Sequence, residues 1–265
     1  MNRHRLLEIA DRPWFPLAFR DLITDMLQFG IVRFRIYDVV IPLIQEVLQH
    51  TKMTQILDLS SGGSGPWVQL QAQLRDRMKH PSVILTDKYP NLKAFKKANM
   101  CSGSNLRYWP EPVDATNVPA YLHGMRTIFS AFHHFEPAAA TKILRDTVDQ
   151  RSAICIFEFT ERRLDGLFLS LLTFPFTLAA APFQKPISLK TLFWVYVIPL
   201  IPCAFTYDAV VSYLKTYSPK DLRELVRNIH APEYVWKIGQ VASGVHSINI
   251  TYLLGFPGDP ATTSE

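Results

Sequence analysis

Short apolar runs alternate with amphipathic segments through the middle of the chain, between residues 50 and 160. The runs are rich in branched and aromatic residues, which is typical of buried strands, whereas the segments between them repeat apolar residues every three to four positions, as helices do. Strands that alternate with helices predict a mostly parallel sheet with right-handed crossovers. The five expected strands lie at 54–59, 82–87, 105–115 (a short extended piece), 126–132 and 152–159.

The first 50 residues follow a different pattern. Their apolar residues recur with helical spacing and show no strand-like alternation, so we expect an N-terminal helical cap over residues 1–50 and an α/β domain over residues 51–265. The opening residues contain Asp11 and Pro13, too early for the apolar core of a signal peptide, and we therefore expect a cytoplasmic protein.

The most unusual stretch is an apolar insertion after the fifth strand, at residues 166–206. Neither Gly166 to Gln184 nor Thr191 to Tyr207 contains a charged residue, and prolines interrupt both runs. Each run is close to the lower limit of about 17 residues for a membrane span. Three interpretations remain open: a buried helical lid over a pocket, a hairpin that dips into one leaflet while Lys185 and Lys190 reach back to the headgroups, or a pair of true spans.

Composition narrows the range of partners. Hydrophobic residues make up 48% of the 265 residues, enough for a sizeable core. The net charge is +5, but the lysines and arginines are scattered, so we expect no nucleic-acid partner, although a basic chain suits an anionic membrane surface. The three cysteines are far apart and show no zinc-site or disulfide spacing; we expect no metal site.

The candidate chemistry lies where the strands end. The sequence ILDLSSGGSGPW, Ile56 to Trp67, places a strand, a nearly side-chain-free turn and a helix in succession. Open α/β sheets bind nucleotide-like ligands at such turns, beside the carboxyl ends of their strands. The residues expected at this edge are Asp58, the turn 60–65, Asp87, Asp114 and the stretch 130–134.

Taken in order, these elements resemble the class I S-adenosylmethionine-dependent methyltransferases. The resemblance implies a Rossmann-like, doubly wound sheet that ends in an antiparallel hairpin, here 234–240 and 247–257. It implies S-adenosylmethionine as cofactor, with Asp87 on the ribose hydroxyls and Asp114 and Ala115 at the adenine. The remaining cofactor-binding residues that it implies are Asp58, Ser60, Gly62, Gly63 and Ser130.

The turn departs from the family pattern at Ser60 and Ser64, where glycine is usual. Serine tolerates a positive φ poorly, so a one-residue shift of the turn is expected. A dinucleotide dehydrogenase is the alternative interpretation, because Asp87 would suit the ribose of a nicotinamide dinucleotide equally well. A pyrophosphate requires an open helix start, however, and Pro66 with Trp67 makes this start bulky.

The candidates for chemistry follow the fourth and fifth strands. His133 or His134 could act as a base, or could cap a helix and pack beside phenylalanines. Glu158 points toward the expected site, but an ion pair with Arg162 or Arg163 is the favoured interpretation. Trp14 and Phe15 could roof the pocket or join the core. Tyr207, with Asp208, could line the pocket rim or cap a loop.

Together these features predict methyl transfer to a hydrophobic small molecule. In the family, the segment after the fifth strand lines the acceptor pocket, and an apolar wall selects an apolar acceptor, such as a quinone-like ring or a lipid. Peripheral membrane association at the inner face is compatible with this prediction. The alternative is a non-catalytic, membrane-associated scaffold that binds S-adenosylmethionine.

Overall fold

A single mixed sheet organises the chain, which we describe from a computed structural model that covers residues 6–78, 81–102, 105–160, 162, 164–183, 189–245 and 248–258. Within these residues seven strands run in the order β3-β2-β1-β4-β5-β7-β6. The pairs among β1 to β5 are parallel, and β7 is antiparallel to β5 and to β6. The strands are β1 (Gln55–Asp58), β2 (Ser82–Leu85), β3 (Leu106–Tyr108), β4 (Met125–Phe129), β5 (Ile154–Glu158), β6 (Tyr234–Ala242) and β7 (Asn249–Pro257).

This arrangement confirms the predicted doubly wound sheet with a closing antiparallel hairpin. The strand order reverses between β1 and β4, because the chain builds outward from β1 to β3 and then returns to the other side of β1. The carboxyl ends of β1 and β4 therefore meet at the switch point where such folds bind their ligands. The extended piece at 105–115 is shorter than expected, with only Leu106–Tyr108 in the sheet.

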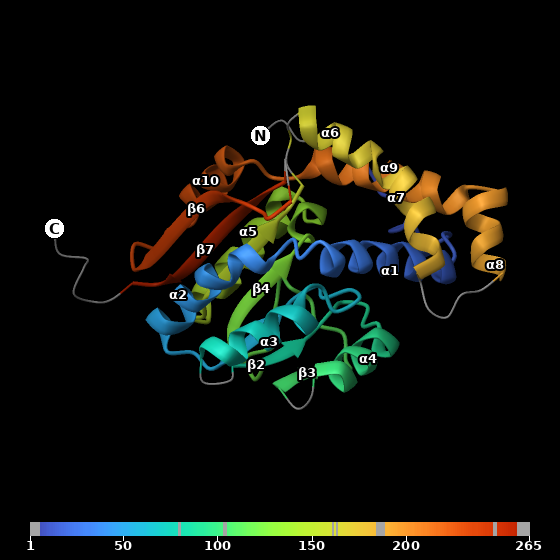
Figure 1. Ribbon diagram of the computed structural model, residues 1–265. Helices are drawn as coiled ribbons and strands as arrows, with labels where there is room; N and C mark the ends of the chain where they lie inside the picture. The colour runs from blue at the N-terminus through green and yellow to red at the C-terminus, as the bar shows by residue number, and fades with distance from the viewer. Residues whose placement is uncertain are drawn as a thin grey trace.

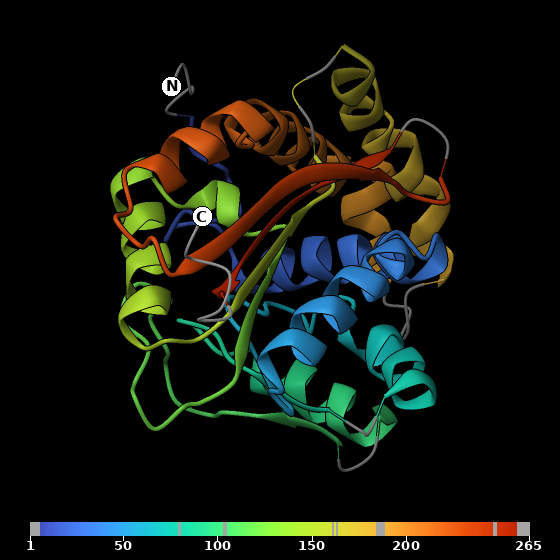
Figure 2. The ribbon, with the colours of Figure 1, turned by 90° about the vertical axis from the view of Figure 1, so that its left-hand side faces the viewer.

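Helices cover both faces of the sheet (Figures 1 and 2). On one face α2 (Ile41–Thr51), α3 (Trp67–Arg77) and α4 (Leu92–Ser102) contribute to one apolar core, and on the other α5 (Pro137–Asp149) and α10 (Pro219–Arg227) contribute to a second. Local sequence explains several helix starts: Pro137 occupies the first turn of α5, and Ser218 and Asp221 form a capping box at α10.

The N-terminal cap is helical, as predicted. It contains α1 (Leu17–Arg33), the short helix η1 (Asp38–Val40) and α2. Helix α1 packs against the apolar insertion as well as toward the sheet. Its buried residues Ile23 and Met26 form a third apolar core with Phe205 and other residues of the insertion.

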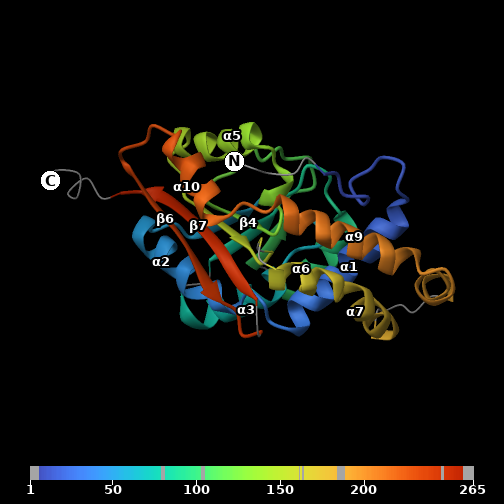
Figure 3. The ribbon, with the colours of Figure 1, turned by 90° about the horizontal axis from the view of Figure 1, so that it is seen from above.

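The apolar insertion is a bundle of short helices. It contains α6 (Leu164–Leu171), α7 (Thr173–Ala180), η4 (Ala181–Phe183), α8 (Leu189–Leu192), η5 (Phe193–Val197) and α9 (Leu200–Lys215). Helix α9 continues past Tyr207 to Lys215, so the helical insertion is longer than the expected 166–206. In Figures 1 and 3, α7 and α8 lie at the end of the molecule opposite β6.

Much of this bundle is exposed apolar surface. The stretch Gly166–Phe183 is long and apolar enough to cross a membrane, yet only 22% of it is buried. The helices Leu189–Val197 and Leu200–Lys215 are together also long and apolar enough, with a bend of 67° between them. A buried lid would hide its large side chains, so the structure does not support that interpretation for α6 to α8. We call this surface the apolar arm; its exposed large residues are Phe168, Leu171, Leu172, Phe183, Leu189, Phe193, Tyr196, Val197, Ile198 and Leu200.

Candidate functional site

The turn after β1 is built from left-handed residues. Ser60, Gly62, Ser64 and Gly65 all have positive φ, between 52° and 93°. Both serines adopt this conformation at the positions that usually hold glycine, so the expected one-residue shift does not account for the turn. A Cβ added to Gly62 would meet open space, whereas a Cβ added to Gly63 would lie 2.9 Å from a methyl group of Thr24 in α1. Gly62 therefore faces outward and Gly63 faces the cap.

Asp58 lies underneath this turn rather than on its surface. Its carboxylate is almost fully buried and accepts hydrogen bonds of 2.6 Å from Ser61 Oγ and from Thr127 Oγ1. Burial raises the pKa of Asp58 to about 7, and the hydrogen bonds from Ser61 and Thr127 offset only part of this effect. In this structure Asp58 holds the turn in place.

Asp87 connects the turn to the end of β2. One carboxylate oxygen accepts from the backbone N–H of Gly62 at 2.8 Å, and the other accepts from the N–H of Tyr89 at 2.9 Å. Burial raises the pKa of Asp87 despite these hydrogen bonds. The contact brings two sequence-predicted residues together at the carboxyl ends of β1 and β2, next to the switch point of the sheet.

A cavity of about 420 Å³ opens beside the turn, between the loop after β3 and the start of α5. Ser60, Asp114 and Ala115 line it, as the resemblance predicts, together with Lys88 and Phe135. Phe135 adds an aromatic residue to the lining of the cavity. We call the turn 60–65, Asp87, Asp114 and Ala115 the cradle.

Asp114 is held from two sides at the mouth of this cavity. Lys88 Nζ donates to one carboxylate oxygen at 2.9 Å, and the Thr116 hydroxyl donates to the other at 2.7 Å. The hydrogen bond from Thr116, followed by that from Lys88, lowers the pKa of Asp114 to about 2. Asp114 is therefore ionised at neutral pH, and Lys88 is a partner that the sequence analysis did not identify.

Ser130 follows β4 with a φ of 46°. Its hydroxyl is hydrogen-bonded to the hydroxyl of Tyr37, which comes from the N-terminal cap and is fully buried against Phe129. The cap thus covers the carboxyl end of β4, and Ser130 is engaged by protein in this structure.

His133 and Glu158 form a buried pair. The Glu158 carboxylate accepts from the backbone N–H of His133 at 3.1 Å and from its Nδ1 at 2.8 Å, and both side chains are 3% exposed. The favoured interpretation of Glu158 as a partner of Arg162 is wrong, because Arg162 pairs with Asp221 of α10. Arg163 lies outside the described residues, as does Lys185.

The N-terminal segment closes over both histidines. Glu8 Oε1 lies 3.8 Å from His133 Nε2, Glu8 Oε2 lies 3.6 Å from His134 Nε2, and Asp11 accepts from His134 Nδ1 at 3.1 Å. Burial alone would lower the pKa of His134, but Asp11 and Glu8 together raise it. About a third of the His134 side chain, 33%, is exposed.

Helix α9 supplies the remaining charged groups. Lys215 Nζ lies 3.2 Å from Glu8 Oε1. Asp208 accepts from the backbone N–H groups of Ile9 and Ala10 at 2.5 and 3.0 Å, so it anchors the segment that carries Glu8. Burial raises the pKa of Asp208 to about 6. We call the following set the histidine cluster: Glu8, Asp11, His133, His134, Glu158, Asp208 and Lys215.

The four candidate substrate-binding residues are dispersed: Glu158 is engaged by His133, and the other three lie elsewhere. Phe15 is buried in the core between α1 and the insertion, which favours the packing interpretation, while Trp14 beside it is 71% exposed. Tyr207 is half exposed on α9, so the expected loop cap at Tyr207 and Asp208 is a helix instead. These residues do not converge on the cavity of the cradle.

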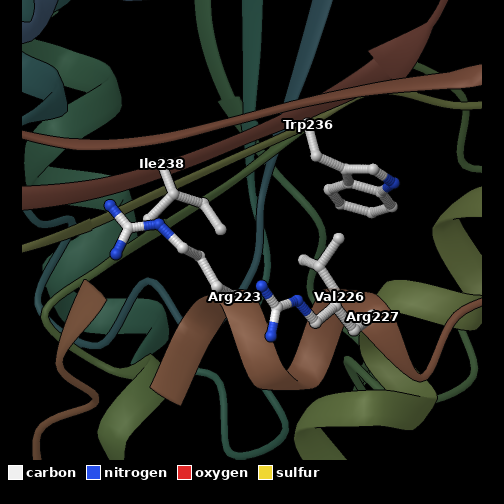
Figure 4. A pocket seen from close by; sticks show the side chains of 5 residues that line it. All are labelled: Arg223, Val226, Arg227, Trp236 and Ile238. Atoms are coloured by element: carbon white, nitrogen blue, oxygen red, sulfur yellow. The ribbon is translucent and has the colours of Figure 1, made fainter. Parts of the chain in front are cut away.

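A second hollow, of about 310 Å³, lies between α10 and β6 (Figure 4). Arg223, Val226 and Arg227 line it from the helix, and Trp236 and Ile238 line it from the strand. None of these five residues is among the sequence-predicted site residues, and the hollow is separate from the lining of the cradle.

Comparison with known proteins identifies the fold. No protein-family model and no curated protein matches the sequence. A SAM-dependent methyltransferase from Aquifex aeolicus matches at 13% identity and a TM-score of 0.50, over 88% of this chain and 97% of its own. PigF, solved with SAH, matches at 14% identity and a TM-score of 0.51, over 91% of this chain and 62% of its own.

The same fold occurs in a protein named as a candidate Zn-dependent alcohol dehydrogenase from Rhodobacter sphaeroides. It matches at 12% identity and a TM-score of 0.52, over 91% of this chain and 98% of its own. The chain spans 54% and 57% of the length of two other structures that it matches, MmcR and LaPhzM. The chain therefore has the α/β fold of class I SAM-dependent methyltransferases, and its activity must be argued from its own residues.

Proposed function

We propose that this protein transfers a methyl group from S-adenosylmethionine to a hydrophobic small molecule. The observation that carries the proposal is the cradle. Asp87 follows β2 beside an outward-facing Gly62, and Asp114 and Ala115 line a cavity next to the same turn. Carboxylates at adjacent strand ends suit the hydroxyls of a ribose and the amino group of an adenine, and the bare turn lets a ligand approach the backbone.

The cap favours S-adenosylmethionine over a dinucleotide. Gln28 of α1 donates from Nε2 to the carbonyl of Gly65 at 2.7 Å, directly ahead of α3, and Trp67 at the start of α3 is fully buried. A dinucleotide places its pyrophosphate on the N–H groups at that helix start. Here α1 lies over the turn, which leaves little room for a pyrophosphate but does not obstruct Asp87.

Methyl transfer itself needs alignment more than acid–base chemistry. The positive charge of the sulfonium disperses as the methyl group leaves, so an apolar surrounding costs little in the transition state. A group that acts on the acceptor is needed where the acceptor is a hydroxyl. The histidine cluster, which follows β4 and β5 at the same edge of the sheet, contains the candidates for this role, His133 and His134.

Calorimetry with the full chain tests the proposal. We expect S-adenosylmethionine and S-adenosylhomocysteine to bind and NAD not to bind, and we expect labelled methyl groups to appear in a component of a lipid extract. Binding without transfer to any extract would favour the non-catalytic scaffold. Binding of NAD in place of S-adenosylmethionine would contradict the proposal outright.

We further propose that the apolar arm docks on one leaflet of a membrane, at its inner face. Phe168 and Leu172 are exposed in the stretch between Gly166 and Phe183, which carries no charge, and Phe193 of η5 is exposed as well. Exposed apolar patches of this kind mark interaction surfaces, and Lys190 beside the arm suits anionic headgroups. Such docking would give the site direct access to lipophilic acceptors.

Flotation with vesicles of phosphatidylcholine and phosphatidylglycerol tests the membrane proposal. The wild-type chain should float, and the double substitution Phe168→Asp with Leu172→Asp should sharply reduce the bound fraction. Met100→Asp is the matched control, because Met100 is also a highly exposed apolar residue but lies on α4. Wild-type protein that stays in the soluble fraction without detergent would refute leaflet docking.

A further inference from the structure

The histidine cluster has the arrangement of a divalent-metal site. We infer that Glu8, His133 and His134 bind a zinc-like transition-metal ion, with a fourth position open to a small ligand. The three side chains can bring one carboxylate oxygen and two ring nitrogens within 4.8 Å of one another. Two histidines and one carboxylate are a common donor set for catalytic zinc and related ions.

The orientation of both rings supports this assignment. His133 Nδ1 is hydrogen-bonded to Glu158 at 2.8 Å and His134 Nδ1 to Asp11 at 3.1 Å. A neutral imidazole that donates from Nδ1 keeps its lone pair on Nε2. Carboxylates that hold the far nitrogen of a histidine are the usual outer partners of metal-bound histidines.

The distances between the donor atoms fit a metal. Both Nε2 atoms face the same carboxylate, at 3.8 Å from Glu8 Oε1 and 3.6 Å from Glu8 Oε2. Metal bonds of about 2.0–2.2 Å in a tetrahedral site set donor separations of roughly 3.3–3.6 Å. The donor atoms lie within 4.8 Å of one another, so the three side chains must draw closer together around an ion. Glu8 is itself positioned, because Asp208 binds the two backbone N–H groups that follow it.

Lys215 is the competitor of the metal. Its ammonium lies 3.2 Å from Glu8 Oε1 and supplies positive charge to the same carboxylate. A bound dication would repel it at this distance. Removal of the lysine charge should therefore tighten metal binding. A purely structural ion-pair network predicts no such gain in metal affinity.

In the proposed reaction, the metal site would bind the hydroxyl group of the methyl acceptor. This use rests on the proposed function, whereas metal binding does not. A hydroxyl acceptor bound to such an ion would lose its proton to water more readily. Its oxygen would form the new bond to the methyl carbon while the carbon–sulfur bond breaks, and that electron pair would stay on sulfur to give S-adenosylhomocysteine.

Zinc titration of the full, chelator-treated chain tests the inference, in the absence of S-adenosylmethionine. We expect one Zn²⁺ per chain by calorimetry and elemental analysis, and a higher melting temperature with zinc. Glu8→Gln and His134→Asn should each weaken binding by more than the roughly 10- to 100-fold that loss of an outer partner costs. Asp11→Asn should fall within that range, and Lys215→Met should bind more tightly than wild type.

Control variants separate the possible outcomes. His230→Asn, at an exposed histidine, should bind zinc as wild type does. Glu8→Gln should leave S-adenosylmethionine affinity unchanged, so failure of the metal site and failure of the cradle are distinguishable. Absence of zinc binding, or equal binding by wild type and the folded Glu8→Gln and His134→Asn variants, would overturn the inference.

Discussion

The cradle and the histidine cluster lie at the same edge of one sheet, yet they are built in different ways. The cradle uses backbone N–H groups, left-handed turn residues and partly exposed acids such as Asp87 and Asp114. The cluster buries ionisable side chains, among them Glu8, Glu158 and Lys215. Buried polar groups are costly unless their partners are in place. The cluster should therefore affect stability strongly and the cradle should affect mainly ligand binding.

The largest expected effect comes from breaking the cluster at Glu158. Glu158→Ala leaves two donors of His133 without their buried acceptor, and each such loss costs roughly 1–3 kcal/mol. The free energy of unfolding in urea should fall by roughly 2–6 kcal/mol. Glu158→Gln keeps one carbonyl acceptor, so it should lower the free energy of unfolding by less. A loss below about 1 kcal/mol for alanine would mean that the pair is not a buried structural element.

The same contrast explains what could be predicted from sequence. The cradle lies within a few short motifs, so the turn, Asp87 and Asp114 could be located from strand ends and glycines, and Ala115 from the family resemblance. The cluster assembles Glu8 and Asp11, the histidines, and residues of α9 from distant parts of the chain. No local pattern links these segments, because the contacts depend on how the cap and α9 pack.

The insertion was harder to predict for a related reason. Its helices could be expected from composition, but apolar residues suit a buried lid and a membrane surface equally. Only the packing of α1 against α9 shows which side chains are covered, such as Phe205, and which are exposed, such as Phe168. The partner of Glu158 was misjudged because the capping residue Asp221, which pairs with Arg162, lies on α10.

The second prediction concerns Asp58, the buried acid of the turn. Its pKa of about 7 in the folded chain exceeds its unfolded value of 3.8 because of burial. The folded state therefore binds the proton more tightly, so this contribution to stability is complete below about pH 4 and is lost as pH rises through 7. The loss amounts to up to about 4 kcal/mol.

Urea denaturation across this pH range provides the measurement. The stability of wild type relative to Asp58→Asn should decline from pH 4 to pH 7 and then level off, because the amide does not titrate. A flat difference would show that Asp58 is ionised in the folded protein throughout.

The third prediction separates ligand binding from stability. Asp87→Ala removes an acceptor for two ribose hydroxyls and frees the N–H of Gly62. Hydrogen bonds to charged groups contribute about 1.5–3 kcal/mol each, so loss of one should raise the Kd for S-adenosylmethionine roughly 10- to 150-fold, and loss of both should raise it further. The free energy of unfolding should change less, because water can replace Asp87 at the exposed N–H groups of Gly62 and Tyr89. Asp149→Ala, at an exposed acid at the end of α5, is the matched control and should bind normally. Equal affinity for both variants would place the cofactor elsewhere.

The smallest effect is expected at the mouth of the cradle, where Lys88 holds Asp114. Exposed ion pairs of this kind contribute little to stability, so Lys88→Ala should barely change the free energy of unfolding. An adenine amino group would have to share the Asp114 oxygen that Lys88 occupies, because the backbone N–H and the hydroxyl of Thr116 both donate to the other oxygen. Lys88→Ala should therefore raise the affinity for S-adenosylmethionine by up to about fivefold. The gain should shrink at high salt, since salt already weakens the wild-type ion pair. A variant that binds more weakly would mean that Lys88 contacts the cofactor instead of competing with it.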